Sequence, residues 1–221
     1  PTSPAIQEFA MDLLTPEYIN SYWATEHGGI VLTHFYGNDD FPLLPDAHSY
    51  PFPWIFADVW IPEKEDASEF RVAAIEEKGE LVLTKPYPYL ARTVWGDAAN
   101  VGKPGWKGDI ERFTKIYFSK WLKDNKPVWA YTQGDFACKY ANGGMSIHGR
   151  SDDVINTSGH RIGTEEIEGA ILKDKQINPQ SPVRNAIVVG APHEEKGTVP
   201  LALILTPQGH RLSLDDEKRL T

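Results

Sequence analysis

The chain has 221 residues, 41% hydrophobic and 24% charged, a composition typical of one or two globular domains. Its formal net charge of -9 argues against a nucleic acid as the main partner, since phosphate binding usually needs a basic face. No apolar run approaches the roughly 18 residues of a membrane span. Cys138 is the single cysteine, which excludes an internal disulfide or thiolate metal cluster. We therefore expect no nucleic-acid or membrane partner, and a reducing, cytoplasmic setting.

The first 130 residues are rich in tryptophan and proline, which predicts loops and short strands packed by large aromatic side chains. Residues 29–35 alternate as a strand does. Residues 70–85 predict a hairpin of two strands joined at an EEKGE turn. Residues 111–122 have apolar side chains at helical spacing.

Residues 128–149 predict a strand, a turn at Gly134 and Asp135, and then two strands paired across residues 141–144. From Gly163 onward the pattern changes to helix, strand, loop, strand. Thr164 is the expected N-cap, and acidic residues in the first turn suit the helix dipole.

The later strands are predicted at residues 185–192 and 199–207, followed by a helix that begins near residue 213. The composition changes near residues 150–153, where we place a domain boundary. The fold class is therefore α/β, with one part over residues 1–150 and a smaller α+β part over residues 151–221.

The stretch NSYWATEHGG, residues 20–29, combines an aromatic pair, a threonine, a glutamate and two glycines. Glycines let a backbone approach a ligand closely. The Thr25 hydroxyl and the Glu26 carboxylate can together bind a phosphate and its magnesium ion. The alternative is a strand end with a buried aromatic pair and a surface glutamate.

The stretch YTQGDF places Asp135 directly after a glycine. A carboxylate there can accept hydrogen bonds from both hydroxyls of a ribose. The alternative is an aspartate that stabilises its own turn.

The stretch GRSDDVINTSGHRIG, residues 149–163, carries Arg150 and Arg161, eleven positions apart, beside the expected domain boundary. The planar fork of donors on arginine suits phosphate. This spacing predicts a nucleotide held between two bodies. The alternative is Arg–Asp pairs that pin a linker.

These three stretches, in their order, resemble signature motifs of the AMP-forming acyl-CoA synthetases in the adenylate-forming superfamily. Two further stretches, ELVLTKPYPYLARTVWGD and ERFTKIYFSKW, resemble its acetyl- and propionyl-CoA synthetase branch. Residues 22–30 together with residues 34–55 look closest to the ligase part of propionyl-CoA synthases, multidomain enzymes that activate 3-hydroxypropionate. The resemblance covers nearly the whole chain.

The resemblance implies a two-step reaction that uses ATP, Mg²⁺ and CoA. A small carboxylic acid (3-hydroxypropionate, propionate or acetate) would attack ATP to give an acyl-adenylate and pyrophosphate. After a swing of the small domain, the thiol of CoA would displace AMP.

The resemblance also assigns roles on the first stretch. Tyr22 would flank the adenine, and Trp23 would close the acyl pocket so that only a short chain fits. Thr25 would contact the phosphate and Glu26 the magnesium ion, both as catalytic residues.

In the later stretches, Asp135 would bind the ribose hydroxyls, with Arg150 beside it on ribose and phosphate. Asp152 matches the hinge on which the small domain turns. The swing would bring one segment to the pantetheine tunnel and the phosphate. That segment carries Ser158, Gly159 and Arg161, the last as a catalytic residue.

By this resemblance, residues 1–150 are the end of the large N-terminal domain, which binds nucleotide and acyl group. Residues 151–221 are most of the small mobile domain, truncated before its catalytic lysine. The upstream phosphate loop is also absent, and His27 stands where the acetyl branch usually has a threonine. We therefore expect an internal fragment whose partners include the other domains of a larger polypeptide, and we expect the fragment alone to be inactive.

Two alternatives remain open. One is an adenylating enzyme that passes the acyl group to an acceptor other than CoA. The other is a non-catalytic nucleotide-binding or docking module of the same fold.

Overall fold

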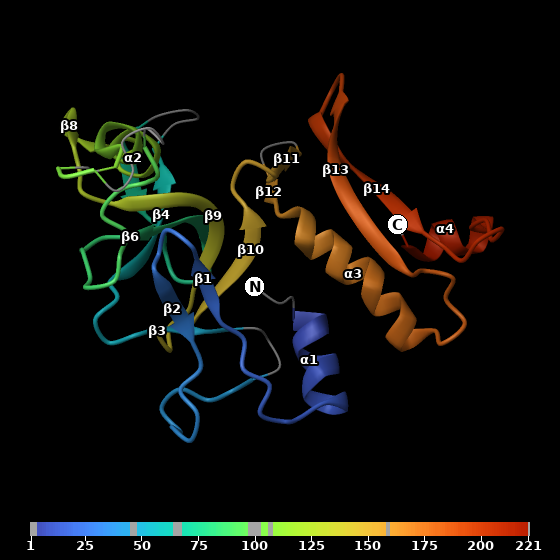
Figure 1. The fold of residues 1–221 in the computed structure, drawn as a ribbon. Helices are drawn as coiled ribbons and strands as arrows, with labels where there is room; N and C mark the ends of the chain where they lie inside the picture. The colour runs from blue at the N-terminus through green and yellow to red at the C-terminus, as the bar shows by residue number, and fades with distance from the viewer. Residues whose placement is uncertain are drawn as a thin grey trace. The chain divides into compact units, whose positions relative to one another are not determined.

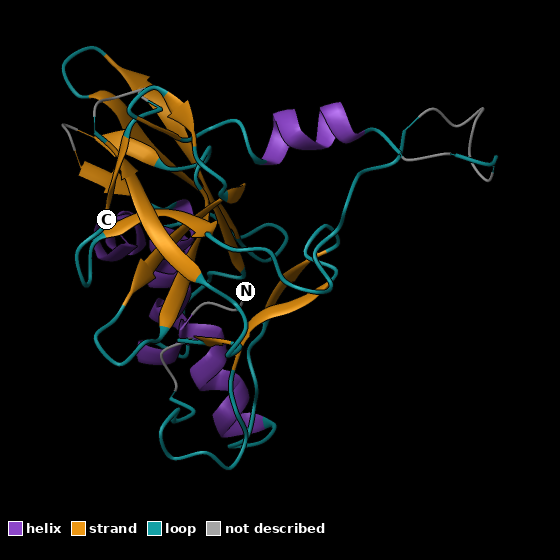
Figure 2. Ribbon diagram, turned by 90° about the vertical axis from the view of Figure 1, so that its left-hand side faces the viewer, coloured by secondary structure: helices purple, strands orange, loops and turns teal. Residues whose placement is uncertain are grey.

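The computed structural model describes residues 4–44, 48–63, 68–96, 103–105, 108–157 and 160–220. In these residues, strands and loops predominate over helices (Figure 2). The chain forms two compact units, each described below by itself. Unit 1 comprises Pro1–Tyr18, Leu44–Ala47 and His148–Thr221, and unit 2 comprises Ile19–Leu43 and His48–Ile147. The domain limits expected at residues 150 and 151 stay a prediction.

The main sheet has five strands in the order β10-β9-β6-β4-β5. Its strands are β4 (Ala57–Pro62), β5 (Phe70–Val72), β6 (Lys78–Leu83), β9 (Tyr131–Lys139) and β10 (Met145–Arg150). A three-stranded antiparallel sheet joins β1 (Tyr22–Ala24), β2 (Gly29–Thr33) and β3 (Tyr50–Pro51). A short pair, β7 (Leu122–Lys123) with β8 (Lys126–Pro127), completes the strands of unit 2.

The hairpin predicted over residues 70–85 is wrong, because β4 lies between its two strands. Trp60 of β4 pairs with Val72 of β5 on one side and with Glu80 of β6 on the other. β4 buries Val59 and Trp60, whereas Val72 is half exposed. The strand with the more deeply buried apolar side chains takes the central place, and β5 becomes the edge.

The turn predicted at Gly134 and Asp135 is also wrong, because β9 continues through these residues. The register changes there: Thr132 pairs with Val82 but Phe136 pairs with Glu80. Residues 133–135 therefore all lie opposite Leu81, and Gly134 has a φ of 82°. The glycine signal marks a bulge, which is a common way to re-aim side chains at a site.

The helix predicted at residues 111–122 is present as α2 (Ile110–Tyr117) and ends earlier. The Asp109 carboxylate caps it by accepting from the Arg112 backbone N–H at 2.9 Å. Phe113 is buried in the largest core cluster, which also contains Tyr22 and Tyr131. Trp121 lies beyond the helix, where its indole N–H donates to the Thr132 hydroxyl at 2.8 Å. Tyr22 and Tyr131 are thus part of the main hydrophobic core.

Unit 1 contains a four-stranded sheet in the order β12-β11-β14-β13, with α3 packed against β13 (Figure 1). Its elements are α1 (Pro4–Leu13), β11 (Ile155–Thr157), β12 (His160–Ile162), α3 (Thr164–Ile177), β13 (Asn185–His193), β14 (Gly197–Leu205) and α4 (Leu214–Leu220). The strand, loop, strand pattern predicted after residue 184 is confirmed as the β13–β14 hairpin, paired along its whole length.

The expected N-cap of α3 is wrong by one residue, since Gly163 caps the helix and Thr164 is already helical. A side chain at Gly163 would meet the His148 carbonyl oxygen at 2.6 Å. The Glu166 carboxylate accepts from the Gly163 N–H at 3.4 Å, which is the half of a capping box that the third helical residue supplies. Within α3, Ile171 is buried, whereas the neighbouring Ala170 is exposed.

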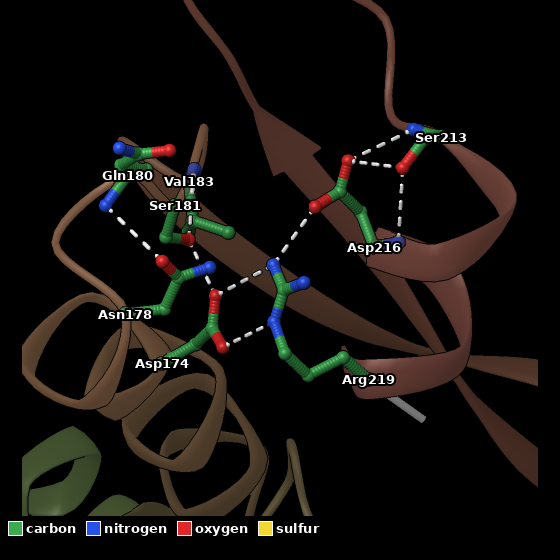
Figure 3. Close-up of polar contacts among 8 residues, drawn as sticks. All are labelled: Asp174, Asn178, Gln180, Ser181, Val183, Ser213, Asp216 and Arg219. Carbon is green, nitrogen blue, oxygen red and sulfur yellow. Dashed lines mark hydrogen bonds and ion pairs between the residues drawn. The ribbon is translucent and has the colours of Figure 1, made fainter.

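An ion-pair network joins α3 to α4 in unit 1 (Figure 3). The Arg219 guanidinium donates to both oxygens of Asp174, at 2.7 and 3.1 Å, and to Asp216 at 2.8 Å. The Ser181 hydroxyl also donates to Asp174, whose side chain is 8% exposed. The hydrogen bonds from Arg219, then from Ser181, lower the pKa of Asp174 below its ordinary value.

We predict that Asp174→Asn loosens the α3–α4 contact at neutral pH. The folded pKa of Asp174 lies below the unfolded value, so ionised Asp174 stabilises unit 1 above the unfolded pKa. This stabilisation is lost as the pH falls through the folded value. All seven tryptophans lie in unit 2, so amide hydrogen exchange of α3 and α4 peptides is the suitable measurement. Exposed Asp215→Asn is the control; equal exchange in both variants would contradict the prediction.

Candidate functional site

A tight turn between β1 and β2 presents Glu26. The His27 N–H donates to the Ala24 carbonyl and the Gly28 N–H to the Thr25 carbonyl, both at 3.1 Å. Gly28 has a φ of 75°, and a Cβ there would lie 1.8 Å from the Tyr89 carbonyl oxygen. Only glycine fits this position. The turn is therefore fixed by its own backbone, and Glu26 is held at its tip.

The bulged strand β9 supplies the second half of the site. Asp135 accepts a hydrogen bond from the buried Tyr22 hydroxyl, although the two residues are 113 positions apart. Gln133, two residues before Asp135, donates through Nε2 to Glu26 Oε2 at 3.4 Å. The β1–β2 segment and β9 are thus joined by the hydrogen bonds from Tyr22 to Asp135 and from Gln133 to Glu26.

Neutral donors surround the Glu26 carboxylate. Its other oxygen, Oε1, accepts from the Tyr117 hydroxyl of α2 at 3.1 Å. Neither Gln133 nor Tyr117 carries a positive charge, so the negative charge of Glu26 is oriented by these contacts and is not neutralised by them. A half-buried carboxylate of this kind can bind a cation.

His27, the residue after Glu26, is 1% exposed. Its ring makes edge-on contacts with Tyr22 and Tyr131, with centroids 5.3 and 5.2 Å apart. Burial lowers the pKa of His27 from its ordinary 6.5 to about 4, against a smaller opposing effect of the Glu26 charge. At neutral pH the imidazole is therefore uncharged, and its Nδ1 has no hydrogen-bond partner among the described residues.

Three of the residues singled out from the sequence, Tyr22, Glu26 and Asp135, lie in this cluster. Trp23 and Thr25 share the segment, and both side chains are exposed, Trp23 by 62%. The sequence motifs YWATEHGG and YTQGDF, although far apart in the chain, meet through these hydrogen bonds.

The remaining predicted residues belong to unit 1. The Arg150 guanidinium donates to Asp152 at 3.1 Å, and both side chains are substantially exposed. An Arg–Asp pair of this kind is what the alternative interpretation of this stretch predicts, in which such pairs hold a linker in place. The backbone of Arg161 lies on β12. Ser158 and Gly159 lie outside the described residues.

The donor set suits a magnesium ion that arrives with phosphates. Among the described residues, no group of three or more histidine, cysteine, aspartate and glutamate side chains could hold a metal ion. Magnesium is usually bound by one or two carboxylates, with substrate phosphates and water as its other ligands. As a single carboxylate, Glu26 fits that arrangement, whereas the residues that the structure describes do not form a metal site made entirely by the protein.

Sequence reasoning missed Tyr117, Tyr131 and Gln133. A signal was present, because Tyr131, Gln133 and Asp135 alternate along one stretch as side chains on one face of a strand do. The turn expected at Gly134 concealed it. Nothing local to α2 indicates that Tyr117 contacts a residue 91 positions earlier.

No helix among the described residues is long and apolar enough to cross a lipid bilayer.

We predict that Gly28→Ala destabilises unit 2 by about 3 kcal/mol, because its Cβ would collide with a backbone carbonyl. Gly37→Ala is the matched control: its φ is 71°, but nothing lies within 4 Å of the added Cβ, so only about 1 kcal/mol of backbone strain is expected. Urea unfolding followed by tryptophan fluorescence measures both. Equal destabilisation would show that the close approach to Tyr89 does not constrain the turn.

We also predict that unit 2 loses stability as the pH falls from 6.5 to 4 because of His27. The pKa of His27 is lower in the folded protein than in the unfolded chain, so the unfolded chain binds the proton at a higher pH. The stabilisation from neutral His27 is therefore complete above the unfolded pKa and is lost as the pH falls toward the folded pKa. The loss is about 3 kcal/mol across this window. Urea unfolding at several pH values should show the slope in the wild type and a flatter profile in His27→Phe. The same slope in both proteins would contradict the assignment.

Comparison with known proteins identifies relatives by sequence. No family model matches the chain. The acetyl-coenzyme A synthetase of Wolinella succinogenes is 35% identical over 202 residues, which cover 91% of this chain and 27% of that protein. The acetyl-coenzyme A synthetase of Pyrobaculum aerophilum is 32% identical over 212 residues, 95% of this chain and again 27% of that protein. The chain thus spans about a quarter of the length of these curated relatives.

Comparison with solved structures agrees with the comparison by sequence. The anthranilate CoA ligase AuaEII, solved in complex with anthranoyl-AMP, superimposes with a TM-score of 0.69 at 17% identity, over 99% of this chain and 35% of that one. This match shows the α/β fold of the C-terminal portion of an adenylate-forming enzyme. Sequence and fold together identify the chain as a homologue of the AMP-forming acyl-CoA synthetases in the adenylate-forming superfamily.

Proposed function

We propose that this chain contributes the nucleotide- and acyl-binding part of an AMP-forming acyl-CoA synthetase. The natural polypeptide would convert a small carboxylic acid and ATP to an acyl-adenylate and pyrophosphate. It would then transfer the acyl group to CoA with release of AMP. The acetyl-coenzyme A synthetases to which the chain is similar support this reaction class.

The single observation that carries the proposal is the joining of Asp135 and Glu26 through β9 and its bulge. A carboxylate has about four lone-pair sites. Asp135 can therefore bind the two ribose hydroxyls in addition to the Tyr22 hydroxyl. Tyr22 is 5% exposed, so it would contact the adenine with the small accessible part of its ring while its hydroxyl holds Asp135.

Glu26 would hold a Mg²⁺ ion, and the exposed Thr25 hydroxyl beside it would bind a phosphate oxygen. When bound, the ion would neutralise charge that develops on the phosphates. The chain itself orients the ligand: the turn fixes Glu26, and β9 fixes the distance from Glu26 to the ribose site. These are positioning and electrostatic contributions.

Trp23 would line the acyl site. Trp23 directly follows Tyr22 and is 62% exposed. Its indole would contact the end of a bound acid and so limit the length of the acid. We therefore propose acetate, propionate or 3-hydroxypropionate as the acid. If the acid is 3-hydroxypropionate, the chain would be the ligase part of a propionyl-CoA synthase. We propose that the enzyme acts in the cytoplasm.

The segment after β10 would serve the second step. We propose Asp152 as the hinge and Arg150 as a contact to ribose and phosphate. The CoA- and phosphate-facing segment would carry Ser158, Gly159 and Arg161. Other domains of a larger polypeptide would supply the phosphate loop and the lysine.

The test uses the natural polypeptide that contains this chain. We predict acid-dependent ATP–pyrophosphate exchange with a short-chain acid, and acyl-CoA formation once CoA is added. Glu26→Gln should lower the rate by at least roughly tenfold, because a metal ligand is lost. Glu8→Gln on the exposed face of α1 is the matched control and should leave the rate unchanged.

Two other outcomes would redirect the proposal. Exchange without acyl-CoA formation would indicate an acceptor other than CoA. Absence of exchange with every acid, from a polypeptide that is folded, would contradict the enzyme assignment and favour a non-catalytic binding module.

A further inference from the structure

We propose that Gln133 is a positioning residue that aims the Glu26 carboxylate at the divalent cation bound with the nucleotide. The inference rests on the proposed function and adds a residue that the sequence motifs did not single out. Gln133 itself would contact neither the cation nor the nucleotide; it would act through Glu26.

A closed ring of contacts carries this inference. The Tyr131 hydroxyl donates to Gln133 Oε1 at 3.0 Å, and Gln133 Nε2 donates to Glu26 Oε2 at 3.4 Å. Glu26 Oε1 accepts from Tyr117 at 3.1 Å. The rings of Tyr117 and Tyr131 stack, with centroids 5.1 Å apart and planes 11° apart, and this contact closes the ring.

The ring fixes which way the amide of Gln133 points. Tyr131 is 1% exposed, and its hydroxyl donates to the amide oxygen. The amide nitrogen is therefore turned toward Glu26, where it can only donate. Among the described residues, the two oxygens of Glu26 thus accept from two different elements, so rotation of the carboxylate is restrained at both oxygens.

The choice of an amide matters for charge. A lysine or arginine at position 133 would neutralise Glu26 and compete with a cation, and a glutamate would repel it. The neutral amide orients the carboxylate and leaves its charge for the ligand. Partners that orient a metal ligand in this way typically change metal affinity by about 10- to 100-fold when they are removed.

The bulge in β9 extends the role of Gln133 to the ribose site. Gln133 and Asp135 both lie in the three-residue stretch opposite Leu81. Asp135 is held by Tyr22, and Gln133 holds Glu26. The same short piece of backbone therefore positions both the proposed ribose ligand and the proposed cation ligand.

The experiment measures binding of Mn²⁺ with ATP to the natural polypeptide by electron paramagnetic resonance, so its readout is separate from activity. We expect Gln133→Ala to weaken Mn²⁺·ATP binding by about tenfold. Binding of AMP without metal should stay within about twofold of the wild type, because Asp135 is retained. Tyr117→Phe removes one hydroxyl from the other oxygen of Glu26, keeps the stacked ring, and should weaken Mn²⁺·ATP binding in the same direction.

The decisive comparison is made in the Glu26→Gln background, where Gln133→Ala should cause no further loss. The exposed Gln180→Ala is the matched control and should bind as the wild type does. Equal losses with and without Glu26, or wild-type binding by both Gln133→Ala and Tyr117→Phe, would overturn the positioning role alone. A folded wild type that binds no Mn²⁺·ATP would overturn the proposed function as well.

Discussion

The two hydrogen-bonded connections between β9 and the β1–β2 segment are the constraint on which the candidate site depends. They join Tyr22 to Asp135 and Glu26 to Gln133 across more than a hundred residues of sequence. Both anchors on β9 lie in its bulge, opposite the single residue Leu81. A site built on a strand rooted in the main core keeps its geometry better than one on loops alone.

The chain uses its carboxylates in two different ways. Asp174 in unit 1 accepts two hydrogen bonds from the Arg219 guanidinium, so its charge is neutralised within the fold (Figure 3). Among the described residues, the Glu26 carboxylate in unit 2 accepts from an amide and a phenol, and the neighbouring His27 is held neutral by burial. The partners therefore distinguish Asp174, whose charge is paired within the fold, from Glu26, whose charge these two neutral donors do not neutralise.

Local patterns predicted those elements whose signal is contained in a short window. The β13–β14 hairpin and the helices α2 and α3 follow from alternation, helical spacing and first-turn acids. Pairing over longer separations was not predictable in this way. Nothing within residues 70–85 indicates that β4 inserts between β5 and β6, because that choice depends on how deeply Val59 and Trp60 can be buried.

The same limit applies to the site. Residue chemistry predicted Glu26 and Asp135 as nucleotide ligands, and the family resemblance added Tyr22. Neither could indicate Tyr117 or the role of Gln133, which arise from contacts between α2, β9 and the β1–β2 turn. A glycine beside an aspartate predicts a turn more readily than a bulge, and the two differ in whether Gln133 and Asp135 stay on one strand.

A crystal structure of the natural polypeptide with a hydrolysis-resistant acyl-adenylate analogue would test the central claim most directly. The account predicts ribose hydroxyls within hydrogen-bond distance of Asp135, the acyl group beside Trp23, and the phosphate beside Thr25 and Glu26. An analogue bound elsewhere, with Asp135 and Glu26 both remote from it, would contradict the account.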